Sequence, residues 1–171
     1  FPDTIDQIEG FGEAAGMESF EHAYYSHLHW TGPAQEACST LGILLGDDGP
    51  AMLSTNDAGA DIAERLVENT VVSTFPDAKP HGLVGIGSQT HITVGAAMND
   101  SGLAVSSNSG HRKFNPAVNP EHLNLYFVVH LIAQHCGDCD DVRRFVEQYR
   151  ISGQKGSNLV VVDAAGNILG V

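Results

Sequence analysis

Residues 94–108 read VGAAMNDSGLAVSSN: two short runs of small and apolar residues joined by the polar turn Asn99-Asp100-Ser101-Gly102. Tight turns favour Asn, Asp, Ser and Gly, and apolar runs on both sides of such a turn predict a β-hairpin. The predicted strands are Ile92–Ala97 and Leu103–Ser107. The hairpin indicates antiparallel sheet, because parallel neighbours would need a long crossover between them.

The same pattern recurs on both sides of this hairpin. The run Cys38–Leu45 is followed by the turn Gly46-Asp47-Asp48-Gly49-Pro50 and by Ala51–Thr55, which predicts another hairpin. Gly156–Val171 is predicted as strand, turn and strand. Single strands are predicted at Val71–Phe75 and Leu83–Gly87, on either side of a loop rich in Pro and Gly.

Helical spacing of apolar residues appears before and after these strands. It predicts helices at Thr4–Gly16, Met17–Trp30, Leu123–His135 and Asp138–Tyr149, with a brief helical turn at Asp61–Val67. Hairpins combined with separate helices predict an α+β fold in which helices cover antiparallel sheets, rather than a parallel doubly wound fold.

Composition excludes several classes of partner. The chain has 171 residues, with 8 Lys and Arg against 21 Asp and Glu, and a net charge of −13. Few basic residues remain to neutralise phosphates, so neither a nucleic acid nor an anionic membrane is an expected partner. The apolar runs, such as Leu41–Leu45, are far shorter than the ~18 residues that a membrane span needs. Residues 1–171 are long enough for one domain.

The two ends of the sequence and its composition give expectations about processing and compartment. The chain begins at Phe1, and the last predicted hairpin stops within its second strand at Val171. We expect a processed or truncated start, and more protein beyond Val171. An acidic, lysine-poor composition with unpaired thiols slightly favours the cytoplasm, and three cysteines do not exclude export.

Three cysteines cannot all pair with one another, so the chain is no disulfide framework. Cys136 and Cys139 form a Cys-x-x-Cys between two predicted helices, a spacing open to zinc, redox chemistry or a plain turn. A structural zinc site needs four ligands, and His130 lies about a turn and a half before Cys136, an awkward third ligand. The plain turn is favoured, and no metal site is predicted.

Cys38 opens a predicted strand, and Asn56-Asp57 ends the partner strand across the hairpin. The thiol and the carboxylate could therefore meet at one edge of a sheet. A cysteine nucleophile needs a proton acceptor and a donor for the oxyanion of acyl transfer. The alternative is that Cys38 packs as a small apolar residue.

Five segments carry a resemblance to a known family: IEGFGEAAG at 8–16, EACST at 36–40, STND at 54–57, the hairpin at 94–108, and GSNLVVVDAAGN at 156–167. Together they resemble the acyl-coenzyme A:6-aminopenicillanic acid acyltransferase family of N-terminal-nucleophile hydrolases. The chain departs from the common family pattern at Ala37, where Gly is usual, and at Asn56-Asp57, which lacks an intervening aromatic residue.

The resemblance implies a four-layer αββα sandwich and a precursor that cuts itself immediately before a Cys, Ser or Thr. The new α-amine, with a pKa of about 8, then serves as the base. By this pattern Cys38 is the nucleophile and Asp57 orients its amine. Asn108 holds substrate or oxyanion, and Asn56 binds substrate. Neither a metal nor an organic cofactor is implied.

We therefore expect an amide-bond hydrolase or acyltransferase that works through an acyl-enzyme after autoproteolytic activation, on a small-molecule amide. It would be a heterodimer of processed chains. Because Ala37 and Cys38 stand in one chain, an alternative is a subunit of a self-cleaved hydrolase whose nucleophile opens a second chain after Val171. Another alternative is a non-catalytic binding protein under redox control of Cys136 and Cys139, with Cys38 packed.

Overall fold

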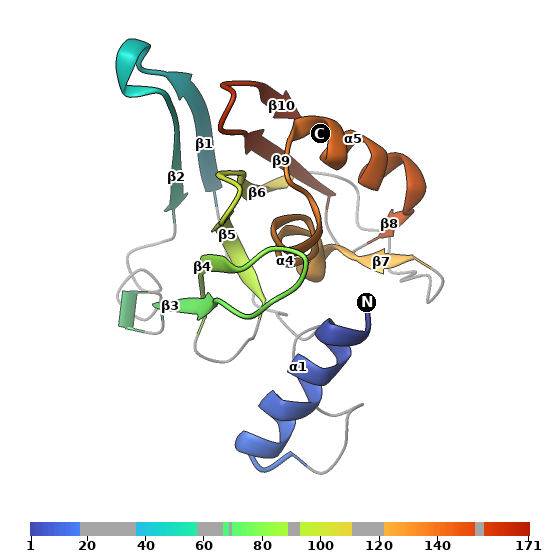
Figure 1. Ribbon diagram of the computed structural model, residues 1–171. Coiled ribbons are helices and arrows are strands. Elements are labelled where there is room, and N and C mark those ends of the chain that lie inside the picture. The colour runs from blue at the N-terminus through green and yellow to red at the C-terminus, as the bar shows by residue number, and fades with distance from the viewer. Residues whose placement is uncertain (18–36, 58–66, 69, 89–92, 111–121, 153–155) are drawn as a thin grey trace.

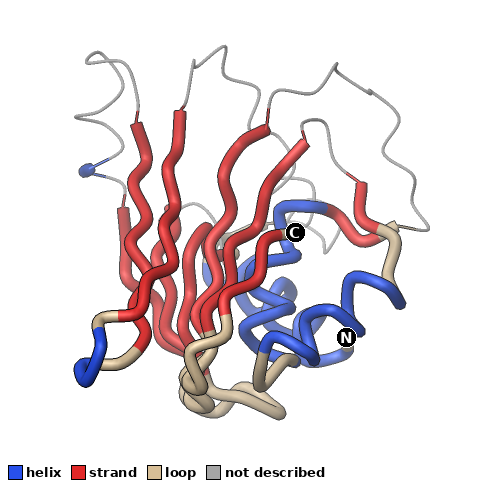
Figure 2. Tube along the Cα trace, turned by 90° about the horizontal axis from the view of Figure 1, so that it is seen from above, coloured by secondary structure: helices blue, strands red, loops and turns tan. Residues whose placement is uncertain are grey.

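The computed structural model describes residues 1–17, 37–57, 67–68, 70–88, 93–110, 122–152 and 156–171, which Figure 1 draws in colour. These residues form three layers. A six-stranded sheet lies between a two-stranded hairpin on one face and helices on the other (Figure 2). The predicted α+β class, with helices over antiparallel sheet, is confirmed.

The central sheet is antiparallel throughout, in the order β10-β9-β6-β5-β4-β3. The hairpin of residues 94–108 provides its middle pair, in which Ala96 lies opposite Ser106. β5 continues to Asn99, two residues past its predicted end, because Met98 and Asn99 still pair with β4. The strands are β3 (Thr70–Phe75), β4 (Leu83–Ser88), β5 (Val94–Asn99), β6 (Ala104–Gly110), β9 (Gly156–Val162) and β10 (Ile168–Gly170).

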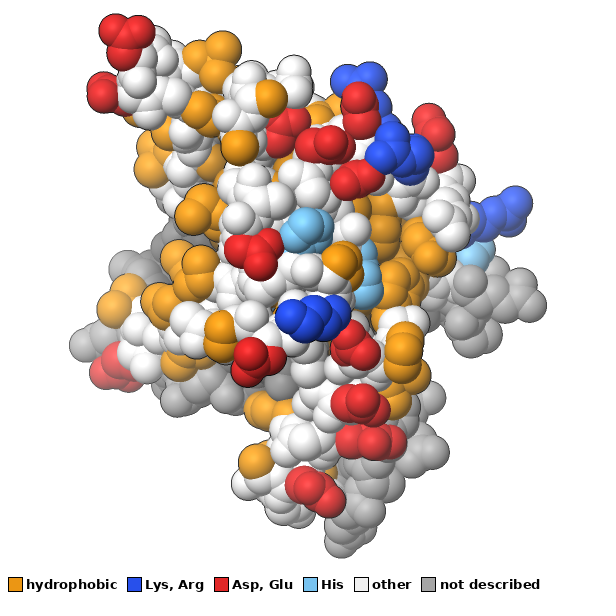
Figure 3. Space-filling view, in the orientation of Figure 1, with side chains coloured by type: hydrophobic (Ala, Val, Ile, Leu, Met, Phe, Trp, Pro, Cys, Tyr) orange, Lys and Arg blue, Asp and Glu red, His pale blue; other side chains and the backbone are white. Residues whose placement is uncertain are grey.

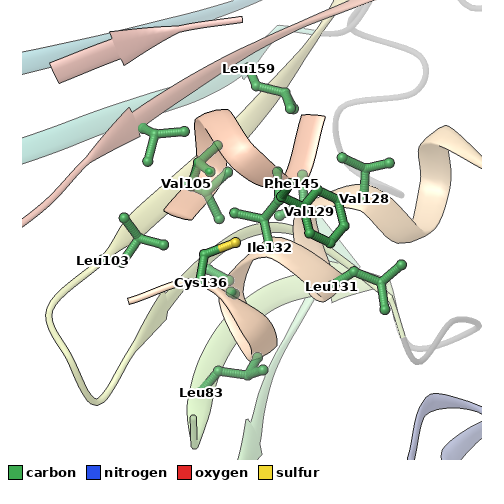
Figure 4. Packing of buried hydrophobic residues seen from close by; sticks show 14 of the residues in the cluster. Leu83, Leu103, Val105, Val128, Val129, Leu131, Ile132, Cys136, Phe145 and Leu159 are labelled. Carbon is green, nitrogen blue, oxygen red and sulfur yellow. The ribbon is translucent and has the colours of Figure 1, made fainter. Parts of the chain in front are cut away.

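The helices described beside the sheet are α1 (Pro2–Ala14), α4 (Leu125–His135) and α5 (Cys139–Gln148). Alternate strand residues such as Leu83, Val105 and Leu159 meet the apolar side of α4 in one buried cluster (Figure 4). α5 begins after Asp138, whose carboxylate accepts a hydrogen bond of 2.8 Å from the Asp141 N–H. This side of the sheet therefore holds the hydrophobic core.

The second face of the sheet carries the predicted hairpin of β1 (Ala37–Leu44) and β2 (Pro50–Asp57), joined through the short 3-10 helix Gly46–Asp48. β1 lies against β6 and β9. The approach is close at Gly42, where a Cβ would stand 2.8 Å from Val162 Cγ2. Gly42 thus lets β1 lie directly on the sheet.

Two short strands depart from the prediction. The helix expected from Leu123 begins two residues later, because Leu123 and Asn124 form β7 and pair in parallel with β8 (Ile151–Ser152). Most of the helix predicted at Met17–Trp30 and of the turn at Asp61–Val67 lies outside the described residues. Within the described part of the chain, no helix is long and apolar enough to cross a bilayer.

Candidate active site

The strand ends at one edge of the molecule bring the predicted site residues together. β1 and β9 begin at this edge and β2 and β6 end at it, while the tight turns lie at the opposite edge (Figure 2). Cys38, the second residue of β1, lies opposite Asn56, and Ala37 lies opposite Asp57. The backbone of Cys38 is therefore next to that of Asp57 across the hairpin, as the sequence pattern predicted.

Cys38 and Thr40 project to the same face of β1, because alternate residues of a strand share a face. Cys38 is half-buried. Thr40 faces the central sheet, where its hydroxyl lies 3.4 Å from Ser106 Oγ of β6. The nucleophile candidate thus stands on the side of the hairpin that faces β6.

Hydroxyl groups fill the contact between the hairpin and β6. Thr40 Oγ1 lies 3.1 Å from Ser54 Oγ, which is itself 2.8 Å from Ser106 Oγ. Asn108 completes this group with its side-chain amide 2.7 Å from Thr40 Oγ1. We call these four residues, Thr40, Ser54, Ser106 and Asn108, the inter-sheet polar cluster.

The surroundings of Asn108 decide which end of its amide is nitrogen. With the nitrogen toward the Ser107 carbonyl, it donates to that oxygen at 3.2 Å and to Thr40 Oγ1 at 2.7 Å. The amide oxygen then accepts from the Thr40 backbone N–H at 3.1 Å. This orientation satisfies both ends of the amide, so Asn108 binds both the side chain and the backbone of β1.

The sequence predicted Asn108 as a site residue but did not single out Thr40, Ser54 or Ser106. One signal was available: Ser106 and Asn108 alternate with the apolar Val105 along β6. Such alternation marks a polar face opposite the core. Which residues would cover that face depends on contacts between segments more than fifty positions apart.

The Cys-x-x-Cys sits elsewhere, between α4 and α5. Both thiols are buried and neither is in a disulfide. Burial, reinforced by Asp141 and Asp138, raises the pKa of Cys136 to about 12. Burial, reinforced by Asp163, raises the pKa of Cys139 to about 11. Both groups are therefore protonated thiols at neutral pH, which disfavours redox reactivity and metal binding.

The turn end of the sheet also bears polar groups, but in structural roles. Asp163 accepts hydrogen bonds from the backbone N–H groups of Cys139, Ala165 and Asn167 at 2.9–3.2 Å. Burial alone would raise the pKa of Asp163, but the hydrogen bonds from the side chain and backbone of Asn167 and from Cys139 lower it below its ordinary value. In the described part of the chain, no three His, Cys, Asp or Glu side chains are placed to hold a metal ion.

Two solved structures show similarity at low identity. One is a variant of the conjugated bile acid hydrolase from Clostridium perfringens, at 10% identity and a TM-score of 0.45, covering 80% of this chain and 39% of that one. The other is penicillin V acylase from Agrobacterium tumefaciens, at 14% identity and a TM-score of 0.46, covering 80% of this chain and 38% of that one. The chain thus spans about two fifths of the length of either protein.

No curated protein matches the sequence at a significant level. Residues 44–171 match the acyl-coenzyme A:6-aminopenicillanic acid acyl-transferase family. That segment runs from the end of β1 to the last residue and includes the whole central sheet. Because most of its length matches, this chain belongs to the acyl-coenzyme A:6-aminopenicillanic acid acyl-transferase family.

Proposed function

We propose that the protein is an N-terminal-nucleophile amide hydrolase or acyltransferase in which Cys38 is the nucleophile. The observation that carries this proposal is the register of the β1–β2 hairpin, which sets the backbone of Cys38 opposite that of Asn56 and next to that of Asp57. A thiol at the start of a strand is suited to attack a carbonyl once an amine base is present. Family membership supports the reaction class.

The amine base comes from self-cleavage of the bond between Ala37 and Cys38. The new α-amine of Cys38 takes the thiol proton, and the sulfur attacks the substrate carbonyl to form a tetrahedral oxyanion. As that intermediate collapses, the ammonium returns the proton to the departing amine and a thioester remains. Water, or a second amine in acyl transfer, then attacks the thioester and regenerates the thiol.

The remaining predicted residues have supporting roles in this scheme. The Asp57 carboxylate orients the α-amine and stabilises it when it is protonated. Asn56 and Asn108 are proposed to contact the substrate or its oxyanion. The substrate is a small-molecule amide, and the segment before Cys38 remains as a second chain of the processed enzyme.

A second candidate places the nucleophile at the start of a chain that begins after Val171. One observation favours it: the family match starts at residue 44, so Cys38 lies outside the matched segment. In that case Cys38 is a packing residue and the described chain is the first subunit. Redox control through Cys136 and Cys139 has less support, because both thiols are buried and have raised pKa values.

N-terminal sequencing of the full-length protein after expression tests these alternatives. We expect a processed chain that starts at Cys38, and neither processing nor amide hydrolysis in Cys38→Ala. Cys136→Ala is the matched control, which replaces a buried thiol between α4 and α5 and should be processed normally. A new N-terminus beyond residue 171, or an active Cys38→Ala, would overturn the assignment.

Alkylation gives an independent test of the same assignment. Iodoacetamide should label Cys38 in the native protein, because that side chain is half-buried, whereas Cys136 and Cys139 are buried and hold their protons. Labelling should abolish hydrolysis in proportion to the adduct at Cys38, as measured by peptide mass. Adducts confined to Cys136 and Cys139 would instead favour redox control.

A further inference from the structure

The inter-sheet polar cluster is unusual for its position. Sheets that stack face to face usually meet through apolar side chains, yet here three hydroxyls and an amide join β1 and β2 to β6. Ser106 is 1% exposed, so its hydroxyl depends on partners inside the protein. Buried hydroxyls cost stability unless they are hydrogen-bonded, and the buried Ser106 is bonded to the part-buried Thr40 and the exposed Ser54.

Mutual bonding makes the cluster specific for one register. If β1 moved along β6 by one residue, Thr40 would turn its hydroxyl away and lose its bonds to Ser106 and Asn108. The nearby apolar contact, where Gly42 lies against Val162 and Ile168, has no comparable directionality. The hydrogen bonds, rather than the apolar contact, therefore define where β1 sits.

Of the four residues of the inter-sheet polar cluster, Thr40 is the nearest to Cys38 along the chain. The two residues are separated by Ser39 alone, a distance of about 7 Å along a strand. Strand ends fray readily, and cleavage before Cys38 would make the nucleophile the terminal residue. The bonds that Asn108 makes to the Thr40 hydroxyl and backbone N–H fasten the strand just behind that terminus.

We propose that Thr40 and Asn108 are positioning residues, which lock β1 on β6 so that the Cys38 sulfur is held in place at the start of β1. This inference rests on the proposed function, because the Thr40–Asn108 bonds, which we call the anchor, position a nucleophile only if Cys38 is that nucleophile. It also gives Asn108 a role through Thr40 in addition to any contact with substrate. Ser54 and Ser106 complete the bonding of the same anchor.

Three variants of the full-length protein test the anchor. Thr40→Val keeps the shape and strand preference of the side chain and removes its hydroxyl, whereas Thr40→Ser keeps the hydroxyl. Thr55→Val is the matched control: the same substitution on the same hairpin, at an exposed side chain whose hydroxyl reaches the Ser39 carbonyl at 3.4 Å. Amide hydrolysis and hydrogen exchange over residues 38–44 are measured for each.

We expect Thr40→Val to lower kcat by about 10- to 100-fold, because a small misplacement of a reacting group has an effect of that order. KM should change by less than about threefold, because a positioning residue acts through Cys38 rather than by binding the substrate. Exchange over residues 38–44 should become faster. Thr40→Ser should recover most of the rate, and Thr55→Val should match the wild type. Normal kcat or unchanged exchange in Thr40→Val would overturn the proposal, as would a Thr40→Ser variant no better than Thr40→Val.

The double variant Thr40→Val/Asn108→Ala separates the two roles of Asn108. If Asn108 acts through Thr40, the double variant should be no slower than the slower single variant. Multiplicative losses would show that Asn108 acts on the substrate independently, and would overturn its positioning role.

Cys38→Ala is measured alongside these variants. If it is inactive while Thr40→Val is normal, the anchor fails and the proposed function stands. If Cys38→Ala is active, both fail.

Discussion

Asn99 and Asn108 lie on neighbouring strands of one hairpin, at opposite ends and on opposite faces of the sheet. Asn99 faces the helices, where its side chain is 5% exposed and donates to the carbonyls of Ala133 and Cys136 at 2.9 and 2.7 Å. Asn108 faces the β1–β2 hairpin and binds Thr40. The same side chain thus fastens the helices on one face and fixes the candidate nucleophile strand on the other.

The two faces also differ in how completely they are buried. The helix face contains the apolar cluster, with Val105, Ile132 and Val161 fully buried. On the other face, Val72 and Ile86 pair with each other across β3 and β4 and remain 67% and 51% exposed. In the view of Figure 3, acidic side chains are spread over the surface and hydrophobic ones lie among them. We infer that stability comes mainly from the helix face.

The largest expected effect is at Asn99. Its amide oxygen also accepts from the Ser101 and Leu103 N–H groups at 3.2 and 3.0 Å, so Asn99→Ala leaves several buried groups without partners. We expect the free energy of unfolding to fall by about 3–4 kcal/mol, measured by urea denaturation. Asn158→Ala, an exposed change on the other face, is the control and should cost less than about 0.5 kcal/mol. A loss below about 1 kcal/mol in Asn99→Ala would contradict the distinction between the faces.

The next effect concerns His130, which α1 and α4 bury on the helix face. Its Nε2 lies 3.0 Å from Gln7 Oε1, and its ring meets Phe75 edge-on at 5.0 Å. Burial, followed by the nearby His135, lowers the pKa of His130 from 6.5 to about 4. As pH falls from 6.5 towards 4, the unfolded chain binds a proton that the folded chain does not, so stability is lost over that window.

The expected loss is about 1.4 kcal/mol per pH unit, roughly 3 kcal/mol in all, and His130→Gln should remove most of this slope. Urea denaturation at a series of pH values measures it, and NMR titration of the imidazole gives the midpoint directly. Because the pKa of His135 is also lowered by burial, a smaller slope should persist in His130→Gln. A midpoint near 6.5 for His130 in the folded protein would show that α1 does not bury it.

Sequence patterns predicted most of the strands because each depends on neighbours in the chain. Turn residues and alternation located β1, β2, β6 and β9 within a few positions, and the acidic start of α5 marked its first turn. The pattern gave no sign of β7 and β8, since a parallel pair of two residues has too little periodicity to recognise. The helix predicted from helical spacing therefore started at Leu123, two residues before α4 begins.

The candidate site divides in the same way. Cys38, Asn56 and Asp57 belong to one hairpin, so their proximity followed from its predicted register. Thr40 and Asn108 are 68 positions apart, and their contact arises only when β1 stacks on β6. Asn99 was predicted as a turn residue, and its bonds to α4 likewise depend on tertiary packing.

A moderate effect is expected where the hairpin meets the sheet. In Gly42→Val the new Cβ would meet Val162 and Ile168 methyl groups at 2.8 and 3.0 Å, which forces β1 away from β9. Those methyl groups can shift, so we expect a loss of about 1–2 kcal/mol in urea denaturation. Gly170→Val is the control, because a Cβ there has no atom within 4 Å. Equal stability of the two variants would mean that the hairpin is not seated closely on β9.

The smallest effect is expected at Val72, and the same substitution at Val105 on the other face is its comparison. Val→Thr preserves the shape of the side chain and replaces a methyl group with a hydroxyl, so its cost reports whether the side chain is buried. At Val105, which is 0% exposed, we expect a loss of about 1–3 kcal/mol; at Val72, which is 67% exposed, a change within about 0.5 kcal/mol. Urea denaturation of the full-length protein measures both. If Val72→Thr cost as much as Val105→Thr, the β3–β4 part of the second face would be covered in the intact protein, and the difference in stability between the faces would not hold there.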